Sequence, residues 1–279
     1  MKRKKELSTI IFMVFILFSF TFYSCTEETT EPTEQSPDIP PQSSLIIDFS
    51  QFPDTVFPAP PGNRFSTDSL ERTNWQWASF NAGIWNVVLT ITLIAPVTAF
   101  KEAFRHKPVL QNDGSWLWSY NVPVGGIIHT VKLYGNSVTS GVEWKMLLSK
   151  QGAYQDFEWF TGFSNLPLTA GTWTLKNDPT NQTPFLFIEW NRDAQQNTAN
   201  IKYTNIVPNA PANGSYIFYG TTTGTTYNRF YDLFGQEENR TINIEWNYEN
   251  LFGRVKDPIH FGDQDWHCWD EQIYNVTCP

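Results

Sequence analysis

The segment NWQWASFNAGIWNVVLTITLIAPVTAFKEAFRHK, residues 74–107, decides the fold because it is long and apolar, with polar residues only at intervals. Seven of its apolar residues recur three or four positions apart, as on one stripe of a helix: Ala78, Ala82, Trp85, Leu89, Leu93, Val97 and Phe100. Basic residues near its end favour a helix C-terminus, and Pro108 cannot continue the helix. We predict a long helix, bent or broken near Pro96; the β-branched residues of 87–94 leave a strand as the alternative.

A helix this apolar belongs either in a membrane or in a protein core. Its most apolar part, residues 85–100, is short for a membrane span and contains Asn86, three threonines and a proline. We therefore predict a buried core helix rather than a second span. A helix that is apolar all round has to be covered on most sides, so the rest of the chain should wrap around it.

After Asp113 the apolar pattern changes to a period of two, which predicts β-strands. Short connections rich in Gly, Asn, Asp and Pro imply antiparallel neighbours, and a sheet of ten or eleven strands should curl strongly or close. The predicted fold class is α+β, mostly antiparallel β: one long N-terminal apolar helix packed in a curved 10–11-stranded meander, a half-barrel or a barrel. Residues 45–279 are assigned to this single domain, with residues 45–49 as a further strand.

Four triplets place a glutamate between an apolar residue and a tryptophan, which raises the question of catalytic acids. Alternate residues of a strand face opposite sides, so the tryptophans should face the core and the glutamates solvent. The residues concerned are Trp144, Trp159, Trp190 and Trp246, and Glu143, Glu158, Glu189 and Glu245. A wet outer face does not raise a carboxyl pKa by burial, as a glycosidase acid requires. We interpret the glutamates as solvated charges paired with Lys or Arg on neighbouring strands.

The first 24 residues have the pattern of a secretory signal peptide: four basic residues, then an apolar run over residues 7–23. They lead into FYSC, residues 22–25, which resembles the lipobox of bacterial lipoproteins, with Phe22 where leucine is commoner. The resemblance implies that Cys25 is lipidated and becomes the first mature residue. An uncleaved membrane anchor is the alternative.

An acidic, proline-rich stretch, TEETTEPTEQSPDIPPQSS, follows at residues 26–44 and contains no basic or aromatic residue. Such a composition cannot bury enough apolar surface to offset its ordering entropy, so residues 25–44 are predicted to form an extended tether. The stretch resembles the surface-export signals of Bacteroidetes lipoproteins. This resemblance implies a lipid-anchored location at the outer membrane, facing the periplasm or the cell surface.

The charge balance argues against a nucleic-acid partner. Removing residues 1–24 takes away four bases and one acid, which moves the formal net charge from −9 to −12. Phosphate binding needs clustered cations, and the basic grouping after residue 5 is small. It consists of Lys101, Arg105 and Lys107.

Two cysteines remain besides Cys25, and they lie ten positions apart near the C-terminus: Cys268 and Cys278. A secretory compartment permits disulfides, so we predict that they form one. A metal site built from His260, His267 and Cys268 is the alternative, but the spacing matches no zinc pattern.

The stretch KDPIHFGDQDWHCWDEQ, residues 256–272, is the densest polar and aromatic cluster. The candidate polar site in it comprises His260, Asp263, Asp265, His267 and Asp270. These residues could form a metal loop or a catalytic His–Asp pair, although the calcium-loop spacing is incomplete. The interpretation we favour is a lid closed by Trp266 and Trp269. Because the chain contains no hydrolase, nucleotide-binding or zinc-protease motif, we assign no catalytic residue, metal or cofactor.

The expected architecture resembles two known solutions: the curved sheet around a helix in carriers and receptors of bacterial lipoprotein sorting, and the barrel of lipocalin-like domains. No motif carries either resemblance, so the fold alone does not assign a function. Our first hypothesis is a non-catalytic, lipid-anchored envelope protein that binds an apolar or glycan ligand. The alternatives are an envelope glycan or lipid hydrolase that uses the C-terminal His/Asp cluster, and a purely structural envelope component. The oligomeric state stays open.

Overall fold

The computed structural model describes residues 35–52 and 72–279 of the 279-residue chain. Within it, Ser36–Pro279 forms one compact unit. The predicted signal peptide, Cys25 and the first part of the predicted tether lie outside the described residues. The later part of that tether, residues 36–44, lies within the compact unit and ends in a short 3-10 helix, η1 (Gln42–Ser44).

The predicted helix is present as α3 (Thr73–Ala103), which has 31 residues. It continues through Pro96, so the expected break at this proline is absent. Its predicted apolar stripe is largely buried: Ala78, Ala82, Leu89, Leu93 and Phe100 are core residues, and Trp85 and Val97 pack against the core half-buried. The opposite face of α3 is exposed, so the expectation that the helix is covered on most sides is wrong.

The strands form one antiparallel sheet in which each strand pairs with the next along the chain. The sheet begins with a short strand, β1 (Val109–Leu110). Nine longer strands follow it: β2 (Trp116–Val124), β3 (Ile127–Val138), β4 (Gly141–Lys150), β5 (Tyr154–Asn165), β6 (Ala170–Asp178), β7 (Asn181–Asp193), β8 (Thr198–Asn205), β9 (Tyr216–Thr221) and β10 (Arg229–Gly235). The sheet ends with β11 (Arg240–Trp246), β12 (Gly253–Lys256), β13 (His267–Trp269) and β14 (Asn275–Val276), and a short helix, α4 (Pro258–Phe261), lies between β12 and β13.

Within the described residues, the meander therefore has 14 strands rather than the ten or eleven we expected, and it is not closed into a barrel. The strands missed by the alternation pattern are short: β1 and β14 have two residues, β13 has three and β12 has four. A period of two cannot be recognised in so few residues. The prediction of a curved antiparallel meander around a helix is confirmed, and the closed-barrel alternative is wrong.

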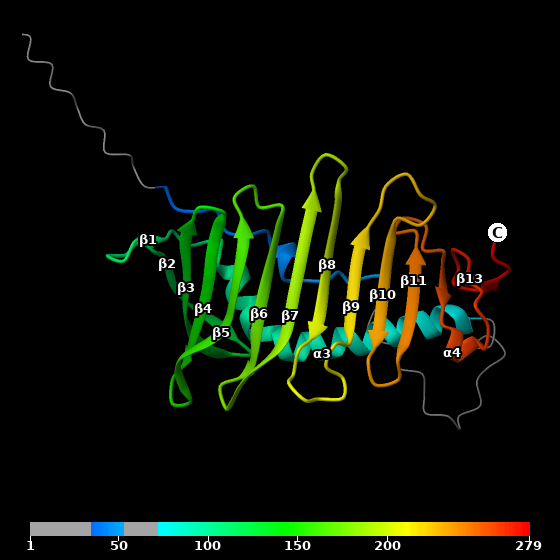
Figure 1. Ribbon diagram of the computed structural model, residues 1–279, viewed down its shortest axis with the longest axis horizontal. Helices are drawn as coiled ribbons and strands as arrows, with labels where there is room; N and C mark the ends of the chain where they lie inside the picture. Colours follow the sequence, from blue (N-terminus) through cyan, green and yellow to red (C-terminus); the bar gives the residue numbers. More distant parts are fainter. Residues whose placement is uncertain (1–34, 53–71) are drawn as a thin grey trace, which may run out of the picture. The chain divides into compact units, whose positions relative to one another are not determined.

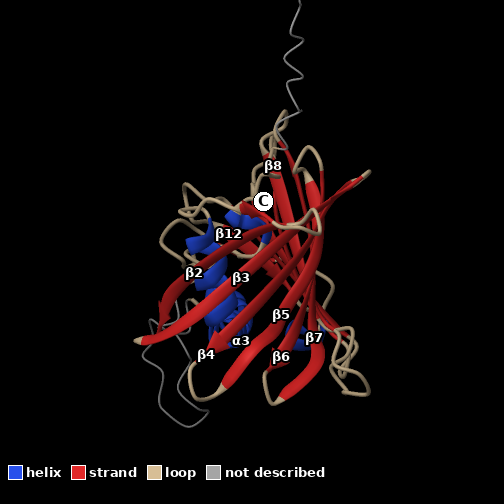
Figure 2. Ribbon diagram, turned by 90° about the vertical axis from the view of Figure 1, so that its left-hand side faces the viewer, coloured by secondary structure: helices blue, strands red, loops and turns tan. Residues whose placement is uncertain are grey.

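The helix runs across the strands rather than along them (Figure 1), and the sheet bends around one side of it (Figure 2). Near its start, Asn74 donates from its side chain to the carbonyl oxygen of Cys268 in β13, at 2.9 Å. Near its end, the carbonyl oxygen of Ala99 accepts a hydrogen bond of 2.6 Å from the Tyr120 hydroxyl in β2. The helix thus joins the two edge regions of the open sheet.

The predicted orientation of the tryptophan and glutamate residues is confirmed. Trp144, Trp159, Trp190 and Trp246 are all buried in the core that also contains the inner face of α3. On the other face of the sheet, the Lys176 ammonium lies 2.9 Å from the Glu158 carboxylate. The Arg254 Nε group donates to Glu245 at 2.8 Å, from the paired position on the next strand. The glutamates are therefore surface charges of the sheet.

Candidate functional site

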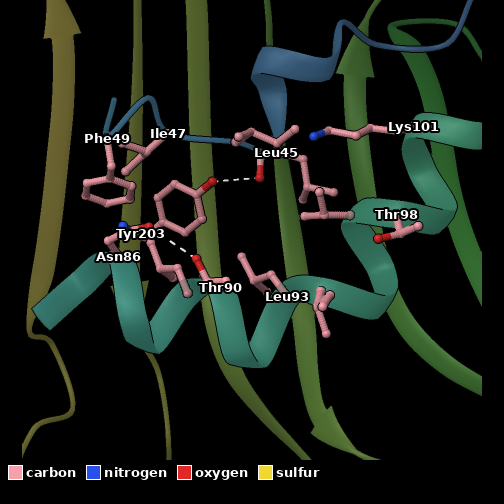
Figure 3. Close-up of a pocket in the computed structure, with 13 residues that line it drawn as sticks. Leu45, Ile47, Phe49, Asn86, Thr90, Leu93, Thr98, Lys101 and Tyr203 are labelled. Atoms are coloured by element: carbon pink, nitrogen blue, oxygen red, sulfur yellow. Dashed lines mark hydrogen bonds between the residues drawn. The ribbon is translucent and has the colours of Figure 1, made fainter. Parts of the chain in front are cut away.

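The candidate site is a groove of about 310 Å³ between α3 and the segment formed by residues 45–49, here called the inner segment. Figure 3 shows the side chains that line it. The helix contributes the apolar side chains of Leu89, Leu93, Ile94 and Val97, and the inner segment contributes Leu45, Ile46, Ile47 and Phe49. A groove of this size and apolar lining is at the small end of ligand-binding cavities.

The inner segment is held by side chains of the sheet rather than by strand pairing, so the predicted strand at residues 45–49 is absent. The Trp173 indole N–H donates to the carbonyl oxygen of Ser44 at 2.9 Å. The Tyr203 hydroxyl donates to the carbonyl oxygen of Leu45 at 2.7 Å, and the Tyr231 hydroxyl donates to that of Asp48. These donors come from β6, β8 and β10, so alternate strands fix one wall of the groove.

Burial raises the pKa of the Tyr203 phenol above its ordinary value of 10.0. The hydroxyl therefore stays protonated and remains a donor to the Leu45 carbonyl oxygen across the physiological pH range. Since the carbonyl oxygens of a buried segment need partners, these phenol and indole donors allow the segment to lie in the core without a neighbouring strand.

Polar groups occur at both ends of the groove. At one end, the Thr90 hydroxyl donates to the Asn86 side-chain oxygen at 3.2 Å. At the other end lies Lys101, which is exposed and whose ammonium group points toward the groove beside Leu45 (Figure 3). Within the described part of the chain, no carboxylate forms an ion pair with Lys101.

The groove is suited to holding an apolar chain. Among the described residues that line it, there is no histidine and no carboxylate. A general acid or base has to be within hydrogen-bond reach of the reacting group. The arrangement can therefore bind an apolar ligand, with hydroxyl, amide and ammonium groups available at its two ends.

The C-terminal cluster is divided among several local contacts. His267 lies 3.1 Å from the Asp263 carboxylate, and this hydrogen bond lowers the pKa of Asp263. His260 instead stacks on Trp77 of α3, with ring centroids 3.7 Å apart. Burial lowers the pKa of His260, which favours its neutral form. Of the two histidines in the candidate polar site, only His267 thus contacts a carboxylate of that site.

The two remaining aspartates of the predicted polar site serve local turns. Asp270 accepts backbone hydrogen bonds from Gln272 at 3.0 Å and from Tyr274 at 2.9 Å. The Asp265 backbone N–H donates to Asp263. In the described part of the chain, no group of three or more His, Cys, Asp or Glu side chains is arranged to hold a metal ion. The Cys268–Cys278 disulfide is present, as predicted.

Sequence reasoning missed the buried carboxylate of Asp257, which is the most heavily bonded acid near this cluster. It forms an ion pair with Arg240, accepts from the Trp77 indole at 2.9 Å, and caps α4 by accepting from the backbone of Ile259 and His260. Burial acts to raise the pKa of Asp257, but these hydrogen bonds outweigh it and hold the pKa below 3.8. Only the cap has a sequence signal, because Asp257 directly precedes a proline.

Comparisons with protein-family models, with curated proteins and with solved structures find no match for this chain. The resemblance to lipocalin-like barrels is wrong, because the sheet of the described residues is open, and no matching structure supports the resemblance to lipoprotein-sorting proteins. Function has to be inferred from the groove, the ends of the chain and the chemistry of the described side chains.

Proposed function

We propose that this protein is a lipid-anchored lipoprotein of the cell envelope that binds the apolar chain of a ligand in the groove between α3 and the inner segment. The groove is the single observation that carries the proposal, because it is apolar, preformed and held open by hydrogen bonds from three strands. The FYSC motif supports the anchor at Cys25, and the acidic stretch that follows it supports an outer-membrane location. The absence of histidines and carboxylates among the described lining residues supports a binding function over catalysis.

Binding can be tested with a series of alkyl ligands of increasing chain length, measured by native mass spectrometry and titration of the full chain. Each methylene that enters the groove should raise affinity about fourfold, until the groove is full. Val97→Trp should fill the groove and abolish binding. Val109→Trp, the same change at an exposed valine of β1, is the matched control and should bind as the unmodified chain does. Binding that is independent of chain length, or unaffected by Val97→Trp, would contradict the proposal.

The anchor can be tested separately by metabolic labelling with an alkyne-bearing fatty acid. The unmodified chain should incorporate the label and Cys25→Ala should not. Cys268→Ser/Cys278→Ser should still incorporate it, because these residues pair with each other. Label retained by Cys25→Ala would place the modification elsewhere and remove the support for lipidation at Cys25.

One observation favours the hydrolase alternative, namely the His267–Asp263 pair at 3.1 Å. A His–Asp pair can orient an imidazole for general-base catalysis. His267→Ala should abolish hydrolysis of an envelope ester or glycoside if this alternative holds. If the chain neither binds alkyl ligands nor hydrolyses these substrates, the purely structural role is the one that remains.

A further inference from the structure

The outer face of α3 carries four exposed aliphatic side chains in one stripe. Ile84, Val88, Ile91 and Ile94 are 42%, 47%, 70% and 52% exposed. Their spacing of four, three and three residues places them on one side of a helix. The face opposite them packs into the core through residues such as Ala82 and Leu89. This stripe, called the outer stripe below, lies outside the groove except for its last member, Ile94.

By length and composition, α3 could cross a membrane, since it has 31 residues and a mean hydropathy of 1.8 over its most apolar window. Its contacts argue against crossing. A third of that window is buried inside the protein, and hydrogen bonds fix both ends of the helix to the sheet at Asn74 and Ala99. A helix fixed in this way can present one face to a lipid surface but cannot enter the bilayer without leaving the sheet.

The charge at the end of the outer stripe indicates what kind of surface it would meet. Lys101 lies in the last turn of α3, and Arg105 and Lys107 follow just beyond the end of the helix; all three are exposed. Glu102 is the acid among them, and it pairs with Arg105 at 2.9 Å and with His106 at 3.4 Å. The chain as a whole has a net charge of −9. The excess of cations beside the outer stripe therefore differs in sign from the net charge of the chain, and it complements a negatively charged surface.

We propose that the outer stripe of α3 rests on an anionic lipid surface, with the aliphatic side chains in the headgroup region and the cations of its C-terminal end on lipid phosphates. Amphipathic helices bind at membrane interfaces through this combination of buried apolar area and attraction to anionic lipids. This inference goes beyond ligand binding in the groove, because three of the four stripe residues, Ile84, Val88 and Ile91, lie outside it.

The chain length between the proposed anchor and the body is consistent with this contact. The proposed anchor is Cys25 and the compact unit begins at Ser36. The eleven residues 25–35 that connect the two can span at most about 40 Å. With Cys25 acylated as proposed, the body is therefore held close to the membrane. A second copy of the chain is a poorer occupant of the stripe, because the first turn of α3 contains no acidic residue that could meet the partner's cations in an antiparallel pair.

The test places an environment-sensitive fluorophore on Ile91→Cys in the full chain reconstituted into vesicles. The new thiol is free for labelling, because Cys268 and Cys278 form a disulfide and Cys25 is acylated in the proposed mature form. In vesicles of phosphatidylglycerol and phosphatidylcholine, the emission should shift to the blue and be quenched by nitroxide-labelled lipid. Thr241→Cys is the control, since this residue is exposed on β11 next to the inward-facing Ile242. A fluorophore at this control position should show neither effect.

Variants of the charged and the aliphatic residues test which side chains contribute to docking on the lipid surface. Arg105→Gln and Lys107→Gln, at exposed residues outside the groove, should each lower the ratio of docked to undocked fluorophore about fivefold at low salt. Exchanging phosphatidylglycerol for phosphatidylcholine should lower it further. Val88→Ser removes an aliphatic side chain beside the fluorophore, and Ile259→Ser in α4 is the control at a residue 61% exposed. Val88→Ser should weaken docking and Ile259→Ser should leave it unchanged.

Two results would overturn the inference. The first is a fluorophore at position 91 that stays in water in vesicles of either composition. The second is a blue shift that depends on protein concentration in the absence of vesicles, because this would show that a second copy covers the outer stripe.

Discussion

The buried carboxylate of Asp257 allows a sharp test of how the helix is fixed to the sheet. Its side chain is 0% exposed and pairs with Arg240 of β11, whose side chain is 24% exposed. It also accepts the indole N–H of Trp77 in α3 and two backbone N–H groups of α4. Asp257 thus connects three elements, of which α3 is far from the other two in the sequence. We expect Asp257→Ala to be among the most destabilising single changes outside the hydrophobic core.

The magnitude follows from the partners left behind. Breaking a buried ion pair by removing one partner costs about 3–5 kcal/mol. Because Arg240 can still reach water, the expected loss in the free energy of unfolding is at the lower end, about 3 kcal/mol. Asp257→Asn keeps an oxygen acceptor but loses the charge, so it should cost about 1–2 kcal/mol, the difference between charged and neutral hydrogen bonds. Asp263→Ala is the matched control, because this carboxylate is 41% exposed and should contribute little.

The assay is urea unfolding of the full chain, followed by circular dichroism and tryptophan fluorescence at several pH values. The folded-state pKa of Asp257 lies below its ordinary value of 3.8. Its contribution should therefore be fully present above that value and be lost as the pH falls through the folded-state pKa. The difference between the unmodified chain and Asp257→Asn should be constant from about pH 5 to about pH 7 and shrink below about pH 4. A loss under about 1 kcal/mol for Asp257→Ala, or a difference that grows in acid, would refute the reasoning.

Two further predictions use the same unfolding assay. A Cβ atom at Gly162 would lie 2.2 Å from the Trp173 ring and 2.4 Å from the Thr172 carbonyl oxygen, so Gly162→Ala should cost about 2–3 kcal/mol. At Gly83 in α3 a Cβ atom would meet nothing within 4 Å, so Gly83→Ala should add up to about 1 kcal/mol. A destabilising Gly83→Ala or a neutral Gly162→Ala would contradict the corresponding expectation. Cys268→Ser/Cys278→Ser should lower the free energy of unfolding by about 2–3 kcal/mol. Reducing the unmodified chain should reproduce that loss, and equal stability of the oxidised and reduced chains would show that the bridge is not stabilising.

The long elements of this fold could be predicted because each repeats its pattern many times. The 31 residues of α3 and the ten residues of β4 contain enough turns and alternations to identify their period. The short strands beside α4 contain one or two alternations each, so their pairing depends on tertiary contacts. The same dependence explains the missed edge of the sheet: nothing in the sequence of β13 says that its Cys268 carbonyl oxygen will meet Asn74 of the helix.

The groove could be predicted only in part. The rings of Trp173, Tyr203 and Tyr231 are buried on the inner face of the sheet, in agreement with the alternation of residues along a strand. It does not show that their N–H and O–H groups reach the backbone of a segment far earlier in the chain, as in the bond from Trp173 to Ser44 with a separation of 129. The exposed side of α3 was missed for a related reason. An apolar helix is normally covered on all sides, and the openness of the sheet that leaves Ile91 uncovered is not visible in the pattern.

The hydrogen bond between the Asn74 backbone N–H and the Asn275 side chain joins positions 201 apart. A ribosome working at about 5–20 residues per second needs about 10–40 s to make that interval. During this delay the apolar helix α3 has been synthesised, but the later strands of the sheet that cover its inner face have not. We expect such a chain to need a factor that shields α3 until the last strands are made.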